Sequence, residues 1–253
     1  MSRYFCDLHI HSCLSPCADD DMTPANIAGM AMLNGLNIVA LTDHNSARNC
    51  PAFFQHAKKY GIIPIPGMEL TTAEDIHVVC LFRTLSAALS FDSYVSERRP
   101  DFKNAPDIFG HQFLVDENDN IIGEEDTLLI NASDIYIDEA FEKVYNLGGV
   151  AIPAHIDRTS NGIVSILGTF PPEPKFTAYE LNKSDSFVEY LEKFPILSGL
   201  SHIISSDAHR LTDIQEAVFS IELDDEPYSS DYVRNKLIDY LLGIKQKEEA
   251  SDG

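Results

Sequence analysis

Eight short apolar runs recur along the chain, and amphipathic helical patterns separate most of them. The runs cover residues 4–10, 37–43, 62–70, 77–82, 149–156, 178–181, 202–208 and 217–223. Near-continuous apolar runs of this length are typical of parallel strands that are buried on both faces, with helices packed outside the sheet. The pattern therefore predicts an α/β fold, and seven or eight strands favour a closed or nearly closed barrel.

The helical segments between these runs have recognisable boundaries. Predicted helices cover residues 23–35, 46–61, 137–149 and 186–197. The first begins with Thr23, a capping residue, followed by Pro24, and it ends at Gly35. The second ends in two lysines before Gly61, which suits both the helix dipole and a left-handed C-cap.

Residues 97–134 interrupt the alternation of strand and helix. The segment is acidic, and its sequence FLVDENDNIIGEE places two apolar runs around a polar turn, which predicts a hairpin. We expect one domain over residues 1–245, with residues 97–134 as an insertion that caps the barrel rim and selects the substrate. Residues 246–253 are expected to form a frayed tail.

Negative charge is the most unusual bulk property of the chain. The 253 residues carry 40 acidic and 18 basic side chains, which gives a formal net charge of -22. A surface of this sign repels phosphate polymers and anionic lipid, so neither long nucleic acid nor a membrane is an expected partner. A small phosphorylated substrate would need local positive charge, which bound metal supplies most simply.

No export or membrane signal is evident in the sequence. The first residues lack the apolar core of a signal peptide, and no apolar run approaches the roughly 20 residues of a membrane span. The five cysteines form no C-x-x-C pair and are expected to be reduced thiols. These features favour a soluble cytoplasmic protein, whose oligomeric state the sequence does not indicate.

Histidines and carboxylates gather at the ends of the predicted strands. Seven of the nine histidines lie in or at the end of a predicted strand: His9, His11, His44, His77, His155, His202 and His209. The carboxylates of Asp43, Glu69 and Asp207 also lie at strand ends. Because the carboxyl ends of parallel barrel strands meet at one rim, these side chains are predicted to converge into one polar cluster.

A cluster of this composition indicates a metal centre. Packed without a cation, it would leave ring nitrogens unpaired and carboxylates desolvated. Imidazole and carboxylate ligands with no required thiolate suit zinc, manganese or iron better than calcium or magnesium. The candidate ligands are too many for one ion, so we expect two or three divalent ions, an arrangement suited to phosphate ester hydrolysis.

Five motifs occur in an order that resembles a known family. DLHIHS, TDHN, GMEL, PAH and SSDAH, between Asp7 and about Arg210, are similar to the motifs of the polymerase and histidinol phosphatase (PHP) family. Within it, the chain looks most like the stand-alone metal-dependent phosphoesterases, because MTPANI follows the first motif and no polymerase domain is attached. The resemblance implies a distorted (β/α)7 barrel with up to three divalent ions.

The resemblance also implies how the ligands divide among the ions. The implied ligands are His9, His11 and Asp207 for one ion, His77 and His155 for a second, His44, His209 and Asp19 for a third, and Glu69 as the bridge between the first two. Among them, His9, His11, Glu69, Asp207 and His209 are the predicted catalytic residues. The segment CADDD is longer than the family pattern, so Asp20 and Cys17 are alternatives to Asp19.

Other polar residues near the predicted rim have supporting roles. Asp7 and Asp43 are expected to orient ligating imidazoles rather than to bind metal. The basic residues Arg158, Lys183 and Arg210 follow strand ends and are predicted to contact substrate phosphate, with surface ion pairs as the alternative. His56, His111 and His202 are expected to be structural.

The predicted function is hydrolysis of a small phosphomonoester or phosphodiester by a metal-activated hydroxide, with a nucleotide or a short oligonucleotide end among the candidate substrates. Three alternatives remain open. These are a phosphatase for histidinol phosphate, a non-catalytic metal-binding regulatory module, and a carbon–nitrogen hydrolase on a similar barrel, although no lysine stands at a matching strand end.

Overall fold

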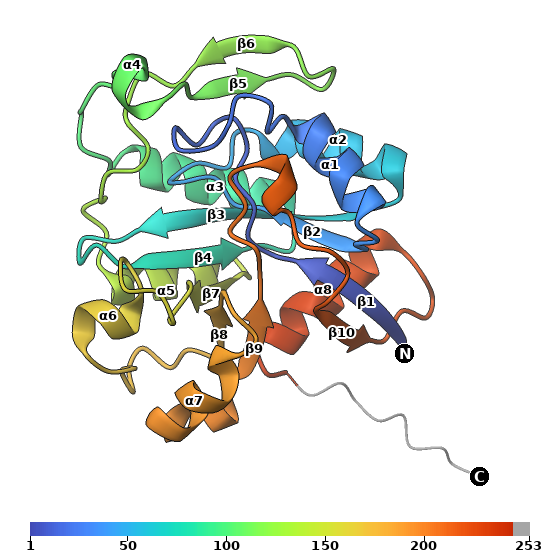
Figure 1. Ribbon diagram of the computed structural model, residues 1–253, viewed down its shortest axis with the longest axis vertical. Helices are drawn as coiled ribbons and strands as arrows, with labels where there is room; N and C mark the ends of the chain where they lie inside the picture. The colour runs from blue at the N-terminus through green and yellow to red at the C-terminus, as the bar shows by residue number, and fades with distance from the viewer. Residues whose placement is uncertain (245–253) are drawn as a thin grey trace.

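The computed structural model describes residues 1–244, and their strands form a curled mixed sheet with helices on both sides (Figure 1). The strands are β1 (Ser2–Asp7), β2 (Ile38–Leu41), β3 (Ile63–Thr71), β4 (His77–Leu81), β5 (Phe113–Val115), β6 (Ile121–Glu124), β7 (Val150–Pro153), β8 (Ala178–Leu181), β9 (Ser201–Ile204) and β10 (Ser220–Leu223). The α-helices are α1 (Pro24–Leu33), α2 (Cys50–Tyr60), α3 (Leu85–Ser96), α4 (Pro106–Phe109), α5 (Ile137–Asn146), α6 (Ile163–Leu167), α7 (Ser186–Lys193) and α8 (Ser230–Leu241), with 3-10 turns at Pro195–Gly199 and Leu211–Asp213. The predicted α/β class is confirmed, whereas the predicted tail, residues 246–253, lies outside the described residues.

The main sheet is not parallel throughout. Its strand order is β10-β1-β2-β3-β4-β7, and β1, β2 and β3 run parallel. β4 pairs antiparallel with β3 and β7, and β10 pairs antiparallel with β1. The expected parallel sheet is therefore wrong at these two strands, and the topology does not establish a (β/α)7 count. Only residues 72–76 connect β3 to β4, whereas a parallel crossover needs about a dozen residues or more.

Strands β8 and β9 lie between β7 and β1 and continue the curl of the sheet. They pair with each other in parallel as a separate two-stranded sheet. The Ile156 N–H donates to the Glu180 carbonyl at 2.9 Å, and the His11 N–H donates to the Ala208 carbonyl at 3.0 Å. These bonds bring the segments that follow β1, β7 and β9 to the same end of the sheet.

Both faces of the main sheet are buried, which explains its near-continuous apolar strands. In β2, Val39 and Leu41 pack in one core cluster with Phe53 of α2. Ile38 and Ala40, on the opposite face, pack in a second cluster to which α8 contributes Leu237. The two helices therefore cover opposite faces of the same strand.

Two predicted helix boundaries are confirmed. The Thr23 hydroxyl caps α1 by accepting a hydrogen bond from the Asn26 N–H at 3.3 Å. Gly61 ends α2 with φ at 72°, the left-handed conformation that glycine adopts at little cost.

Of the described helices, none has both the length and the apolar character that a membrane crossing requires.

The predicted hairpin is present as β5 and β6, which pair antiparallel and lie at the upper edge of the molecule in Figure 1. The hairpin packs on loops near the end of the sheet. The Phe113 N–H donates to the Cys13 carbonyl at 2.8 Å, and the Asn49 side chain donates to the Phe113 carbonyl at 3.0 Å. That residues 97–134 are an insertion into a single domain stays a prediction.

Candidate metal centre

Eight of the nine predicted metal ligands converge at one end of the sheet. His9 and His11 follow β1, His44 follows β2, Glu69 lies in β3, His77 begins β4, His155 follows β7, and Asp207 and His209 follow β9. Because β4 runs antiparallel, its first residue lies at the same end as the last residues of its neighbours. The antiparallel strand therefore still delivers its histidine to the cluster.

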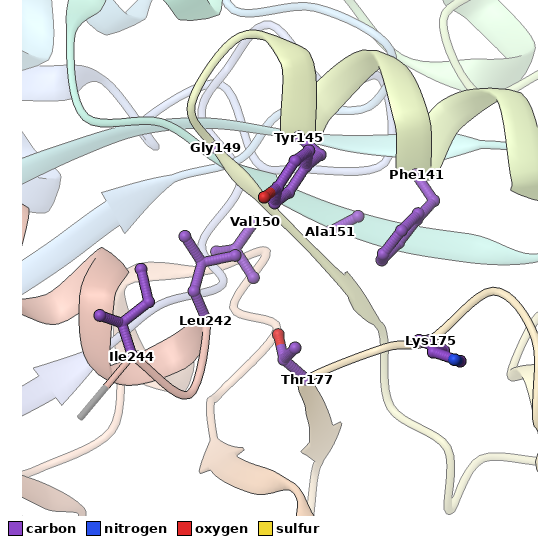
Figure 2. Close-up of a pocket in the computed structure, with 9 residues that line it drawn as sticks. All are labelled: Phe141, Tyr145, Gly149, Val150, Ala151, Lys175, Thr177, Leu242 and Ile244. Carbon is purple, nitrogen blue, oxygen red and sulfur yellow. The ribbon is translucent and has the colours of Figure 1, made fainter.

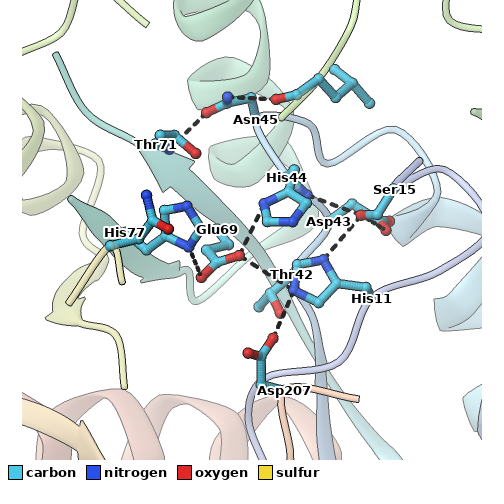
Figure 3. Close-up of polar contacts among 12 residues, drawn as sticks. His11, Ser15, Thr42, Asp43, His44, Asn45, Glu69, Thr71, His77 and Asp207 are labelled. Atoms are coloured by element: carbon cyan, nitrogen blue, oxygen red, sulfur yellow. Dashed lines mark hydrogen bonds and ion pairs between the residues drawn. The ribbon is translucent and has the colours of Figure 1, made fainter. Parts of the chain in front are cut away.

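Glu69 lies at the centre of the cluster and is almost completely buried (Figure 3). Its Oε1 lies 2.8 Å from His77 Nδ1, 3.2 Å from His155 Nε2 and 3.3 Å from His9 Nε2. Its Oε2 lies 3.0 Å from His44 Nδ1 and 3.3 Å from His11 Nε2. One carboxylate thus contacts five imidazoles, which is the environment of a group that bridges two ions.

The two histidines of the first motif present nitrogen atoms to the same point. Their Nε2 atoms lie 3.1 Å apart, and Asp207 Oδ1 lies 3.4 Å from the Nε2 of His9 and 3.2 Å from that of His11. Each Nδ1 is engaged elsewhere, at 2.9 Å from Glu180 Oε2 for His9 and at 3.0 Å from Ser15 Oγ for His11. With hydrogens on both Nδ1 atoms, two lone pairs and two carboxylates face one space. This donor set fits a divalent cation.

The clustered histidines show pKa shifts in two directions. Burial alone would lower the pKa of His9 and of His11, but nearby carboxylates raise the pKa of His9 well above its usual value and that of His11 to about 9. Burial, reinforced by the positive charge of His11, lowers the pKa of His44 to about 4 and that of His209 to about 3. Metal binding at the first pair would displace protons, whereas the second pair is already in the neutral form that binds metal.

The ligand atoms fall into three overlapping groups, within each of which they lie within 4.8 Å of one another. The groups are His9, His11, Glu69 and Asp207; His44, Glu69 and His77; and His11, His44 and His209. His155 lies beside the second group, since its Nε2 is 3.3 Å from His77 Nδ1 and 3.2 Å from Glu69 Oε1. The arrangement is suited to more than one metal ion, although it fixes neither their number nor their identity.

The structure does not bring Asp19 to the cluster. Its side chain is 53% exposed and pairs with Arg210, whose Nε lies 3.6 Å away. The alternatives Asp20 and Cys17 are exposed as well. The loop is nevertheless attached to the cluster, because the Asp19 N–H donates to the His209 carbonyl at 2.9 Å. The final ligand of the His11, His44 and His209 group therefore stays unassigned.

Of the three predicted phosphate-binding residues, the structure places only Arg158 at the cluster. Arg158 pairs with Asp207 Oδ2 and lines a cavity of about 130 Å³ together with Ser160, Asn161 and six of the candidate ligands. Lys183 is exposed and its backbone N–H donates to Asp157, whereas Arg210 faces Asp19. No residue of the 97–134 segment is among those that line this cavity.

The predicted supporting carboxylates are both buried near the cluster. Asp43 accepts hydrogen bonds from the Ser12 N–H at 2.6 Å and from the Ser15 hydroxyl at 2.8 Å, so it anchors the loop that contacts His11 (Figure 3). Asp7 accepts from the Ser206 N–H at 3.1 Å, next to Asp207, and burial raises the pKa of Asp7 to about 6.

Sequence reasoning missed Glu180 and Ser15, which contact the first histidine pair. Glu180 lies in the apolar run AYEL, and an acidic residue within a run expected to form a buried strand was the available signal, because such a residue is seldom buried without a partner. The three histidines predicted to be structural lie outside the cluster. His56 lies in α2, His111 stacks on Phe113 and His202 packs on Phe187.

A larger cavity, of about 380 Å³, lies at the opposite ends of β7 and β8 (Figure 2). Its lining is mainly apolar and includes Phe141, Tyr145, Val150 and Leu242. The described residues that line it include Lys175 but no histidine or carboxylate, so they offer no set of metal ligands. The smaller cavity at the metal-ligand cluster is therefore the candidate active site.

Solved structures with the same fold include two of endonuclease Q. The lesion-specific endonuclease of Pyrococcus furiosus is 17% identical, with a TM-score of 0.65 over 96% of this chain and 57% of that one. A complex of endonuclease Q with a 27-mer duplex that carries an abasic lesion is 18% identical, with a TM-score of 0.62 over 96% of this chain and 57% of that one. A Bifidobacterium adolescentis protein, provisionally classed as a metal-dependent phosphoesterase, is 16% identical, with a TM-score of 0.58 over 81% of this chain and 87% of that one.

These structures correct the expectation that long nucleic acid is excluded. That expectation rested on net charge alone, and it is wrong, because endonuclease Q, a structural neighbour of this chain, was solved in complex with a 27-mer duplex that has an abasic lesion at its active site. This chain spans 57% of the length of the endonuclease Q chains that it matches.

Sequence comparison gives the family. An error-prone DNA polymerase of Symbiobacterium thermophilum is 36% identical over 77 residues, which is 30% of this chain but only 7% of the polymerase. The model of the PHP domain matches residues 7–157, well over half of the chain, and this stretch holds six of the eight clustered ligands. The chain belongs to the PHP domain family.

Proposed function

We propose that this protein is a metal-dependent phosphoesterase that hydrolyses phosphomonoesters or phosphodiesters at the cluster around Glu69. The observation that carries the proposal is the contact of this one buried carboxylate with five imidazoles. Nucleotides, oligonucleotide ends and the phosphodiester backbone of DNA are all candidate substrates, the last because the fold is shared with endonuclease Q.

The residues of the cluster have distinct tasks in this proposal. The clustered histidines, Glu69 and Asp207 would hold two or three ions of zinc, manganese or iron. When bound, such ions supply a water of lowered pKa and neutralise the charge that develops on phosphate oxygens. Arg158 would leave Asp207 and bind a phosphate oxygen, since it is the cation at the mouth of the cavity. His209 is 26% exposed and neutral, because burial lowers its pKa to about 3, so it would serve as a metal ligand and water would supply the proton that the leaving oxygen takes up.

A substrate panel tests the proposal. Protein stripped by a chelator and reloaded separately with Zn²⁺, Mn²⁺ or Fe²⁺ would be assayed with p-nitrophenyl phosphate, bis-p-nitrophenyl phosphate, histidinol phosphate, nucleotides and a duplex with an abasic site. We expect metal-dependent release of phosphate or alcohol from at least one of these esters, and no release after chelation.

The same panel separates the alternatives. Stoichiometric metal binding without turnover of any ester would support a regulatory module. Turnover of histidinol phosphate alone would support that phosphatase. Hydrolysis of carbon–nitrogen substrates in place of esters would contradict the proposal, and no lysine is among the described residues that line the cavity.

A further inference from the structure

Glu180 is an acidic residue inside an otherwise apolar strand. All four residues of β8 are buried, and the Glu180 side chain has no exposed surface. A buried carboxylate persists only where strong hydrogen bonds or opposite charges compensate for its lost hydration. The partners of Glu180 therefore indicate why it lies there.

One oxygen of Glu180 holds two candidate metal ligands from different strands. Its Oε2 lies 2.9 Å from His9 Nδ1 and accepts the backbone N–H of His155 at 3.0 Å. His155 has φ at 29°, an uncommon conformation for a residue with a side chain, so a fixed partner for its N–H helps to define its position. The other oxygen, Oε1, is buried and makes no hydrogen bond within the described structure.

The bond to His9 also determines which ring nitrogen faces the cluster. Because an ionised carboxylate accepts hydrogen bonds only, it keeps a hydrogen on Nδ1 of His9, so in the metal-binding neutral form of the ring the lone pair is on Nε2. That Nε2 lies 3.1 Å from His11 Nε2 and 3.3 Å from Glu69 Oε1. The lone pair therefore faces the space where the donor set fits a cation.

His11 is held differently, which makes Glu180 specific to His9. The Nδ1 of His11 lies 3.0 Å from the Ser15 hydroxyl, and that hydroxyl donates to Asp43 at 2.8 Å. The hydroxyl gives its one hydrogen to Asp43 and therefore accepts from His11 Nδ1, so His11 is held through a serine, whereas the Glu180 carboxylate contacts the His9 ring with no group between them. His9 is the member of the pair with a buried carboxylate directly behind it.

We infer that Glu180 is a positioning residue of the metal centre, which fixes the ring of His9 and the backbone of His155 so that two neighbouring groups of ligands keep their geometry. This inference rests on the proposed function, because it takes the cluster to bind divalent ions. Glu180 itself binds no metal in this assignment and acts through the two histidines. Carboxylates that hold a ligating imidazole in this way typically raise metal affinity 10- to 100-fold.

The test measures metal affinity rather than turnover. Glu180→Ala and Glu180→Gln would be compared with the wild-type protein and with Glu222→Gln, a control on β10 whose side chain is 65% exposed. Dissociation constants for Zn²⁺ would be obtained by competition with a chromogenic chelator. The absorption bands of the Co²⁺-loaded proteins would report the geometry of the bound ion.

We expect Glu180→Ala to weaken Zn²⁺ binding by roughly 100-fold and to shift the Co²⁺ bands. Glu180→Gln should weaken binding by only about tenfold, because its carbonyl can accept both hydrogen bonds while its amide replaces the unpartnered oxygen. Should the alanine variant fail to fold, the glutamine variant carries the same prediction. Glu222→Gln should match the wild type.

Unchanged dissociation constants and Co²⁺ spectra in both Glu180 variants, with tight binding by the wild type, would overturn this inference and leave the proposed function standing. Equal losses of thermal stability with and without metal, at unchanged affinity, would likewise show a purely structural role. Failure of the wild-type protein to bind any of the metals would instead overturn the proposed function and this inference together.

Discussion

Replacement of Arg158 by alanine is the sharpest test of how the site binds phosphate. Arg158 is the one arginine or lysine among the described residues that line the cavity at the cluster. Its guanidinium pairs with Asp207 Oδ2, whereas Asp207 Oδ1 faces the first histidine pair. The substitution therefore removes the positive side chain at the mouth of the cavity and releases one oxygen of a candidate metal ligand.

The expected size of the effect follows from exposure. A hydrogen bond to a charged group contributes about 1.5–3 kcal/mol. The Arg158 side chain is 45% exposed, so water competes for it, and about 1–2 kcal/mol is the appropriate range for this site. Since about 1.4 kcal/mol corresponds to a factor of ten, kcat/KM should fall by about 5- to 30-fold.

The metal should respond in the opposite direction. Without its arginine partner, Asp207 keeps its full negative charge for the ions, so metal affinity should be equal or higher in Arg158→Ala. Kinetics with p-nitrophenyl phosphate at saturating metal, and metal competition measured in parallel, would check both effects. Arg3→Ala is the control, because Arg3 is 64% exposed on β1 and pairs with Glu222. A kcat/KM equal to that of the wild type, or a loss of metal, would refute the reasoning.

Three further predictions concern the cluster, the core and pH. Glu69→Gln removes the negative charge that five imidazoles contact. Metal content, measured by elemental analysis, and phosphatase activity should both fall by about 100-fold or more. Wild-type activity in this variant would exclude a bridging role for Glu69. Gly149→Ala should destabilise the fold by about 1–3 kcal/mol in urea unfolding, since the new Cβ would lie 2.6 Å from the Leu81 carbonyl, whereas Gly123→Ala meets no atom within 4 Å and should be neutral. Burial lowers the pKa of His202 in the folded protein. As the pH falls below about 6.5, the His202 ring therefore binds a proton in the unfolded chain before it does so in the folded protein, and the free energy of unfolding decreases. His202→Phe should show a smaller loss of unfolding free energy between about pH 7.5 and pH 5, and an unchanged loss would contradict this assignment.

The general fold could be predicted because burial on both faces leaves a plain pattern in the sequence. Runs such as that of β2 are apolar throughout, since its alternate residues enter two different core clusters. Strand direction leaves no such pattern, which is why the antiparallel direction of β4 was missed. The five residues between β3 and β4 do contain that information, because they are too few for a crossover helix.

The candidate site could be predicted where position in a strand determines it. Residues at strand ends, such as His44 and His155, need only the general rule that those ends meet. Asp19 lies in a loop, and loop conformation depends on contacts such as its backbone bond to His209, which the sequence does not specify. Glu180 lies within a strand rather than a loop, but it was missed because its partners, His9 and His155, are distant in sequence and the surrounding run is apolar.

Net charge is a poor guide to whether nucleic acid can be a substrate, because charges act over short distances in salt. At physiological ionic strength the screening length is about 8 Å, so an exposed acidic side chain farther than this from the cluster has little influence on a phosphate there. A phosphate in the cavity would meet Arg158, four imidazoles and the carboxylates of Glu69 and Asp207, whose negative charge the proposed ions would offset. Long-range repulsion would still slow the approach of a duplex, and a rate constant for association that rises with added salt would be its signature. For this reason, a comparison of nucleotide and duplex substrates at two salt concentrations separates what the surface repels from what the site can cleave.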